Sequence, residues 1–130
     1  MEERDFEELL ALEKAFYTKL IETEGLTREL LEAVERQDQM SIRMLLAMRR
    51  KPVTELQEIR GHRKLKRLDL SESDGGQFDR LVAGGVPQCA GEEPVARQTA
   101  VNRRLLERLL EEDRAISRRL CGNRSCYKDQ

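Results

Sequence analysis

The feature that most limits the possible folds of this chain is the spacing of its apolar residues. Over residues 3–36, 39–68 and 92–120, apolar side chains recur every three or four positions, as on one face of an α-helix. Charged residues make up 38% of the chain and aromatic residues only 4%. This composition is typical of long helices and coiled coils, whereas β-sheets favour β-branched and aromatic residues. We therefore predict an all-α protein.

Turn and capping residues divide this pattern into elements. Gln37 and Asp38 mark a turn between a helix over 3–36 and a second over 39–68, because the Asp38 carboxylate can accept N–H bonds at a helix start. Pro52 removes one backbone bond, so we predict a kink near it; the apolar pattern continues, which disfavours a break. Residues 70–91 are rich in Gly and Pro, which predicts a connector with room for one or two helical turns over 77–83. A third helix over 92–120 precedes a frayed tail over 121–130.

The first two predicted helices carry opposite charges. Residues 1–38 hold 12 acidic and 5 basic side chains, whereas residues 43–67 hold 9 basic and 2 acidic ones. Opposite charges favour packing of these helices as an antiparallel hairpin. The chain length fits one domain. We therefore predict a single domain over 1–130, an elongated bundle of this hairpin and a third, amphipathic C-terminal helix.

The sequence offers no convincing catalytic or metal-binding constellation. The single histidine, His62, lies in a basic polar stretch, where we expect it to be solvated. His62 and Cys89 are too isolated from Cys121 and Cys126 to give the paired ligand spacing of a structural zinc site. An active site needs several convergent groups. We expect no enzyme activity, no metal and no cofactor, and three reduced thiols; a disulfide between Cys121 and Cys126 is sterically conceivable after oxidation in air, but it would close only a small loop and stabilise little.

The sequence also indicates where the protein resides in the cell and whether it binds polyanions such as nucleic acids. No apolar run approaches the ~18 residues of a membrane span, and the acidic start does not resemble a secretory signal, so we expect a cytoplasmic protein. The basic run bounded by Arg60 and Arg67 has the charge to contact phosphates. It lacks the interleaved aromatic residues of a nucleic-acid module. Nucleic-acid binding is therefore a less favoured alternative to balancing the acidic first helix.

The third long helix has an apolar stripe wider than one neighbouring helix needs. Two polar residues interrupt it, Asn102 and Asp113, which lie either at its wet edge or at a register-setting or partner-facing position. Met40, Met44 and Met48 also follow helical spacing and are expected to be core residues first and an adaptable binding surface second. We predict that a protein partner binds a face made of Asn102, Leu105, Leu106, Leu109, Leu110, Asp113, Ile116 and Leu120.

Three segments carry a family resemblance: LLALEKAFYTKLIETEGLTRELLEAVERQD, MLLAMRRKPVTELQEI and VNRRLLERLLEEDRAISRRL. Their shared features are the spacing of Leu and Glu, Asp38 before the second helix, RRK before an apolar run, and Asn102-Arg103 before Leu105-Leu106. In these features the chain resembles the FlgN/FliT-like chaperones of the bacterial flagellar type III export system. The Gly/Pro-rich connector and the cysteine-containing tail depart from the family pattern.

The resemblance implies a cytoplasmic chaperone. Such a protein would bind the helical segment of an export substrate, such as a hook-filament junction protein or the filament cap, and prevent its premature assembly. An amphipathic substrate helix would fit the wide apolar face of the third helix. The same face would favour self-association when empty. The alternative is a generic helical coiled-coil scaffold or adaptor that dimerises.

Overall fold

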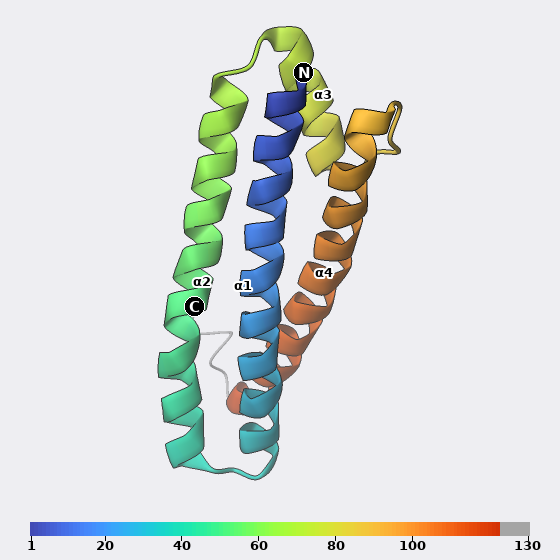
Figure 1. Ribbon diagram of the computed structural model, residues 1–130. Helices are drawn as coiled ribbons and strands as arrows, with labels where there is room; N and C mark the ends of the chain where they lie inside the picture. Colours follow the sequence, from blue (N-terminus) through green and yellow to red (C-terminus); the bar gives the residue numbers. More distant parts are fainter. Residues whose placement is uncertain (123–130) are drawn as a thin grey trace.

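The computed structural model describes residues 1–122, which fold into helices without a strand (Figure 1). The elements are α1 (Glu3–Glu35), α2 (Gln39–Leu68), α3 (Glu72–Val82), a 3₁₀ turn η1 (Ala90–Glu92) and α4 (Glu93–Cys121). α1 and α2 form an antiparallel hairpin, and α4 runs along the other side of α1 in the same direction as α1 (Figure 1). This confirms the predicted all-α helical bundle. Nearly all of the predicted frayed tail over 121–130 lies outside the described residues.

The hairpin turn lies where the sequence predicts it. Gln37 adopts a left-handed conformation with φ 57°. The Asp38 side chain then caps α2, accepting a hydrogen bond from the Ser41 backbone N–H at 3.1 Å and one from the Ser41 hydroxyl at 2.6 Å. These bonds satisfy groups at the helix start and reverse the chain over two residues.

α2 continues through Pro52 without a break. The proline ring is buried between Leu45 and Leu56, on the side of α2 that faces the other long helices. The continuity predicted from the apolar pattern is therefore confirmed, and the kink near Pro52 stays a prediction.

The prediction of a connector over 70–91 is wrong at residues Glu72–Val82, which form α3; the one or two helical turns predicted over 77–83 are part of this longer helix. The Ser71 hydroxyl caps this helix by accepting a bond from the Asp74 N–H at 3.2 Å. Phe78 and Leu81 are buried against α1 and α4. Paired glycines disfavour a helix intrinsically, but burial of these two apolar side chains outweighs that preference.

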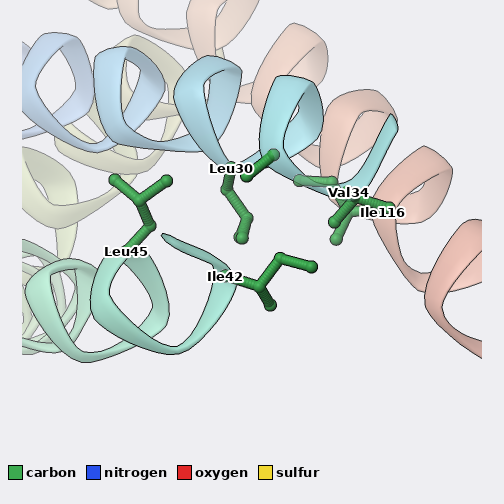
Figure 2. Close-up of a cluster of buried hydrophobic side chains, with 6 residues drawn as sticks. Leu30, Val34, Ile42, Leu45 and Ile116 are labelled. Atoms are coloured by element: carbon green, nitrogen blue, oxygen red, sulfur yellow. The ribbon is translucent and has the colours of Figure 1, made fainter. Parts of the chain in front are cut away.

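The core is divided along α1 into three clusters. Towards α3, Leu9 packs with Phe78, Leu81, Val95 and Ala96. In the middle, Phe16 and Leu20 pack with Leu56, Leu105 and Leu109. At the hairpin end, Leu30 and Val34 of α1 meet Ile42 and Leu45 of α2 and Ile116 of α4, as Figure 2 shows. α1 and α4 thus contribute to all three clusters, whereas α2 contributes only to the middle cluster and the cluster at the hairpin end.

Two buried threonines separate the last two clusters. Thr23 and Thr27 are both fully buried. Their hydroxyls donate to the carbonyl oxygens of Lys19 and Thr23 respectively, each at 2.7 Å within α1. Bonding to the preceding helical turn satisfies these hydroxyls without a partner on another helix.

The opposite charges of the first two helices pair at the α3 end of the bundle. Lys66 lies 2.7 Å from Asp5 and 2.6 Å from Glu8, and Arg63 lies 3.0 Å from Glu13. Hydrogen bonds from Lys66 lower the pKa of the Asp5 and Glu8 carboxyl groups. Acidic residues of α1 also form ion pairs with α4; for example, Glu24 Oε2 lies 2.7 Å from Arg108 Nε.

Candidate functional site

Most of the predicted partner-binding face of α4 is part of the protein's own core. Leu105, Leu109 and Ile116 are only 5–8% exposed, and Asn102 is 3% exposed. α4 packs along α1, and Leu105, Leu109 and Ile116 also share core clusters with side chains of α2, so the stripe is covered within the molecule. The prediction that these four residues are available to a partner in the closed bundle is therefore wrong.

The rest of that face is not a continuous apolar surface. Leu106 is half-buried against the middle cluster, while Leu110 and Leu120 are exposed. Ten residues separate Leu110 from Leu120, a distance of about 15 Å along a helix. Isolated exposed leucines are common on protein surfaces and do not by themselves define a site.

The two polar residues of the α4 stripe connect the helices of this molecule. The Asn102 side-chain amide donates to the Glu13 backbone oxygen and to Glu13 Oε2, both at 2.8 Å. Asp113 accepts a hydrogen bond from Arg49 of α2 at 2.8 Å. A slip of α4 by one turn would break both contacts. Between the register-setting and the partner-facing interpretations of Asn102 and Asp113, the structure therefore favours the register-setting one.

The three methionines of α2 are not core residues. Met40, Met44 and Met48 are 82%, 56% and 50% exposed. They lie on a different side of α2 from the buried Leu45 and Leu56. The expectation of a core role is wrong, and the adaptable surface that was the second interpretation agrees with their exposure.

Met48 borders a shallow groove along the outer junction of α1 and α2, which we call the outer groove. Its lining consists of Ile21, Glu22, Gly25, Leu26, Glu29, Ala47, Met48 and Lys51. Ile21 is 43% exposed, Leu26 is half-buried, and Met44 lies one helical turn before Met48. The groove therefore combines an apolar surface with small residues at Gly25 and Ala47.

No contact within residues 1–122 requires a glycine at position 25. It lies in the interior of the 33-residue helix α1, without positive φ, and a Cβ atom at this position would meet nothing within 4 Å. Glycine in a helix interior costs about 0.5–1 kcal/mol relative to alanine. Its absent side chain leaves room for the close approach of another backbone.

Charged residues border the outer groove with opposite signs on its two sides. On α1, Glu22 is paired with Lys19 at 3.2 Å, whereas Glu29 forms no ion pair within residues 1–122. On α2, Lys51 is exposed and likewise has no ion-pair partner in that range. Glu29 and Lys51 are thus available to a ligand with charges of both signs.

The basic run of α2 is partly used within the molecule. Arg63 and Lys66 pair with α1, and Arg67 pairs with Asp79 of α3 at 3.0 Å. Arg60 and Lys64 form no ion pair among the described residues. The run therefore offers fewer free cations for phosphate contacts than its sequence suggests.

The histidine and cysteines are placed as follows. His62 is exposed, as expected. Cys89 is a free, exposed thiol. Cys121 is disulfide-bonded, so the expectation of three reduced thiols is wrong at this residue; Cys126 lies outside the described residues. Among residues 1–122, no group of three or more His, Cys, Asp or Glu side chains is arranged to hold a metal ion.

Comparisons with known proteins identify no similar protein. No protein-family profile matches the chain, and neither a curated protein nor a solved structure matches it significantly. None of the described helices combines the length and apolar character needed to cross a membrane.

Proposed function

We propose that this protein binds an amphipathic helix of a partner protein in the outer groove between α1 and α2. One observation carries the proposal: Gly25 opens the groove where Ile21 and Met48 expose apolar surface. Nothing in the described chain fills the space above Gly25. A helix with a narrow apolar stripe fits such a surface by the helix-in-groove mode of recognition.

The groove also limits the chemistry of the partner helix. The α1 side of the groove runs from Ile21 to Glu29, roughly 12 Å at ~1.5 Å per residue, which matches about two turns of a bound helix. A basic residue beside the apolar stripe would pair with Glu29, and an acidic residue on the other side would pair with Lys51. Flexible methionines would let the groove adjust to more than one partner sequence.

The family resemblance supports a more specific form of the proposal. The partner would be the helical segment of a flagellar export substrate, such as a hook-filament junction protein or the filament cap. The protein would then act as a cytoplasmic chaperone, because covering the apolar stripe of that segment prevents its premature assembly.

Affinity co-purification from the source cells tests the proposal with matched variants. Met48→Glu places a charge in the groove, whereas Leu65→Glu changes an exposed leucine of the same helix outside the groove lining. We expect wild type and Leu65→Glu to retain the same partner and Met48→Glu to lose it while remaining helical by circular dichroism. Equal retention by both variants would contradict the proposed site.

Two further measurements define the partner. A synthetic peptide of the retained protein's helical segment should gain helicity on binding, and Gly25→Gln should weaken its affinity about tenfold or more. Sedimentation equilibrium separates the scaffold alternative, because a dimer of the purified chain that Met48→Glu dissociates would assign the groove to a second copy. A retained partner unrelated to flagellar export would contradict the chaperone form of the proposal only.

A further inference from the structure

A second pocket, open to solvent beside the exposed Arg60 and Arg103, lies where the three long helices meet the end of α3. Its volume is about 180 Å³, and its lining includes Arg60 and Arg63 of α2 and Arg103 of α4. Only Arg63 has a carboxylate neighbour, Glu13 at 3.0 Å. Arg60 and Arg103 form no hydrogen bond or ion pair with the described residues. The pocket lining therefore carries a surplus of two positive charges.

Buried donors in the pocket lack acceptors. Thr99 is 2% exposed, and its hydroxyl has no hydrogen-bond partner. The Nε atom of Arg63 is also buried without a partner. The side-chain oxygen of Asn102 does not accept from either group and instead accepts a hydrogen bond from Gln98 Nε2 at 3.1 Å. Glu13 Oε1 is also buried without a hydrogen bond, but it lies 3.0 Å from the Arg63 guanidinium. Leaving a buried donor unsatisfied costs about 1–3 kcal/mol, so the two donors beside surplus positive charge favour an anionic acceptor in the pocket.

The remaining lining is apolar and selects among anions. Phe16 is 5% exposed and lies beneath the Arg63 guanidinium, whose central carbon is 4.9 Å from the ring centre. Val82 and Leu106 complete this side of the pocket. A fully hydrated inorganic anion gains nothing from such a surface, whereas an acid with a short hydrocarbon group buries it there.

We propose that this pocket binds a small organic carboxylate. Its two oxygens accept hydrogen bonds from the guanidinium groups and from the Thr99 hydroxyl, and its short aliphatic part lies against Phe16 and Leu106. Planar guanidinium donors match the geometry of a carboxylate and remain charged at all physiological pH values. The space corresponds to roughly six water molecules at ~30 Å³ each, which limits the ligand to a few carbon atoms. This site is separate from the outer groove and does not depend on the proposed function.

Amide NMR titration of the full chain with butyrate tests the site, with chloride at equal ionic strength as reference. We expect saturable shifts at Thr99 and Arg103 at concentrations up to about 50 mM, and a rise in melting temperature from binding to the folded state only. Inorganic phosphate should produce weaker shifts at these residues.

Single substitutions identify the groups responsible. Arg103→Gln should weaken butyrate binding about tenfold or more. Arg104→Gln, which removes an exposed, unpaired arginine one residue away, should leave affinity unchanged. Thr99→Val keeps the side-chain shape and removes an unsatisfied hydroxyl, so it should fold normally and bind more weakly.

Three results would overturn the assignment. Shifts that do not saturate, or that chloride reproduces, would mean a general salt effect. Equal loss of affinity in Arg103→Gln and Arg104→Gln would mean non-specific attraction. Tighter binding of phosphate than of butyrate would exclude an organic carboxylate as the preferred ligand.

Discussion

The inner face of α4 and the outer groove differ in what covers them, although both present apolar residues at helical spacing. α1 and α2 enclose Leu105, Leu109 and Ile116, whereas Met44, Met48 and Ile21 remain about half exposed. Periodic spacing identifies which side of a helix is apolar, but the number of neighbouring helices decides whether that side is covered. The wide stripe of α4 is covered by α1 and by core side chains of α2, whereas the narrower methionine row of α2 remains at least half exposed.

The strongest way to test this comparison is to truncate one residue from each surface. Leu109→Ala should lower the free energy of unfolding by about 2–5 kcal/mol, because it opens a cavity in the middle cluster. Met44→Ala should change it by less than about 0.5 kcal/mol, because the side chain is exposed. Urea denaturation followed by circular dichroism measures both. Similar losses for the two variants would show that the methionine row is covered in solution.

Acid titration tests how much the buried Glu92 carboxylate stabilises the α3 end of the bundle. Glu92 is 2% exposed and accepts hydrogen bonds from Arg80 and Gln77 at 2.6 Å and from the Gln88 N–H at 2.8 Å. The Arg80 hydrogen bond is the main cause that lowers its pKa from 4.5 to about 2, despite burial. Because the folded-state pKa is lower, this carboxylate stabilises the fold fully above pH 4.5, on the order of 3 kcal/mol.

That stabilisation should disappear as the pH falls from about 4.5 towards 2. Glu92→Gln should therefore be less stable than wild type at pH 7, and the difference should shrink over this pH range. Urea denaturation at several pH values measures the difference. A constant difference between the two proteins would show that the carboxylate charge does not contribute through Arg80.

A third test concerns the polar contact within the covered face. Asn102→Ala should cost about 1–3 kcal/mol, because it leaves the buried Glu13 carboxylate with one partner fewer. The effects of Asn102→Ala and Glu13→Gln should be non-additive in a double-mutant cycle, since the two side chains are in direct contact. Additive effects in denaturant unfolding would show that Asn102 does not fix the register of α4 through Glu13.

The smallest expected change in stability comes from substituting Gly25, which lines the outer groove. Gly25→Ala and Gly61→Ala should each stabilise the protein by up to about 1 kcal/mol, because both glycines are helical and have open space for a Cβ atom. Gly61 lies outside the groove lining and is the matched control. Thermal unfolding measures stability, and only Gly25→Ala should also weaken partner binding. Destabilisation by Gly25→Ala alone would show that the groove is filled in the free protein.

Local signals predicted most of the fold. The apolar spacing, the Asp38 cap and the charge difference between the first two helices lead to the observed hairpin. α3 was predicted only as one or two helical turns over 77–83, because Gly75 and Gly76 resemble turn residues, and its stability comes from Phe78 and Leu81 packing against distant parts of the chain. Such long-range burial is not encoded in the local pattern.

The candidate site could be predicted only in part. Asn102 and Asp113 stood out in the sequence, but their partners Glu13 and Arg49 lie on other helices. The methionine row was visible in the sequence, although its exposure depends on which side of α2 packs against α1. Gly25 was a potential signal, because an interior helical glycine without a turn indicates space beside it.

Methyl NMR of the full chain with a soluble paramagnetic gadolinium chelate tests the central claim most directly, without requiring a known partner. The account predicts strong broadening of the Met44 and Met48 methyl resonances and little broadening of those of Leu109 and Ile116. Comparable broadening of the α4 methyl groups would contradict it, because the inner face of α4 would then be open to solvent and the originally predicted binding face would be available.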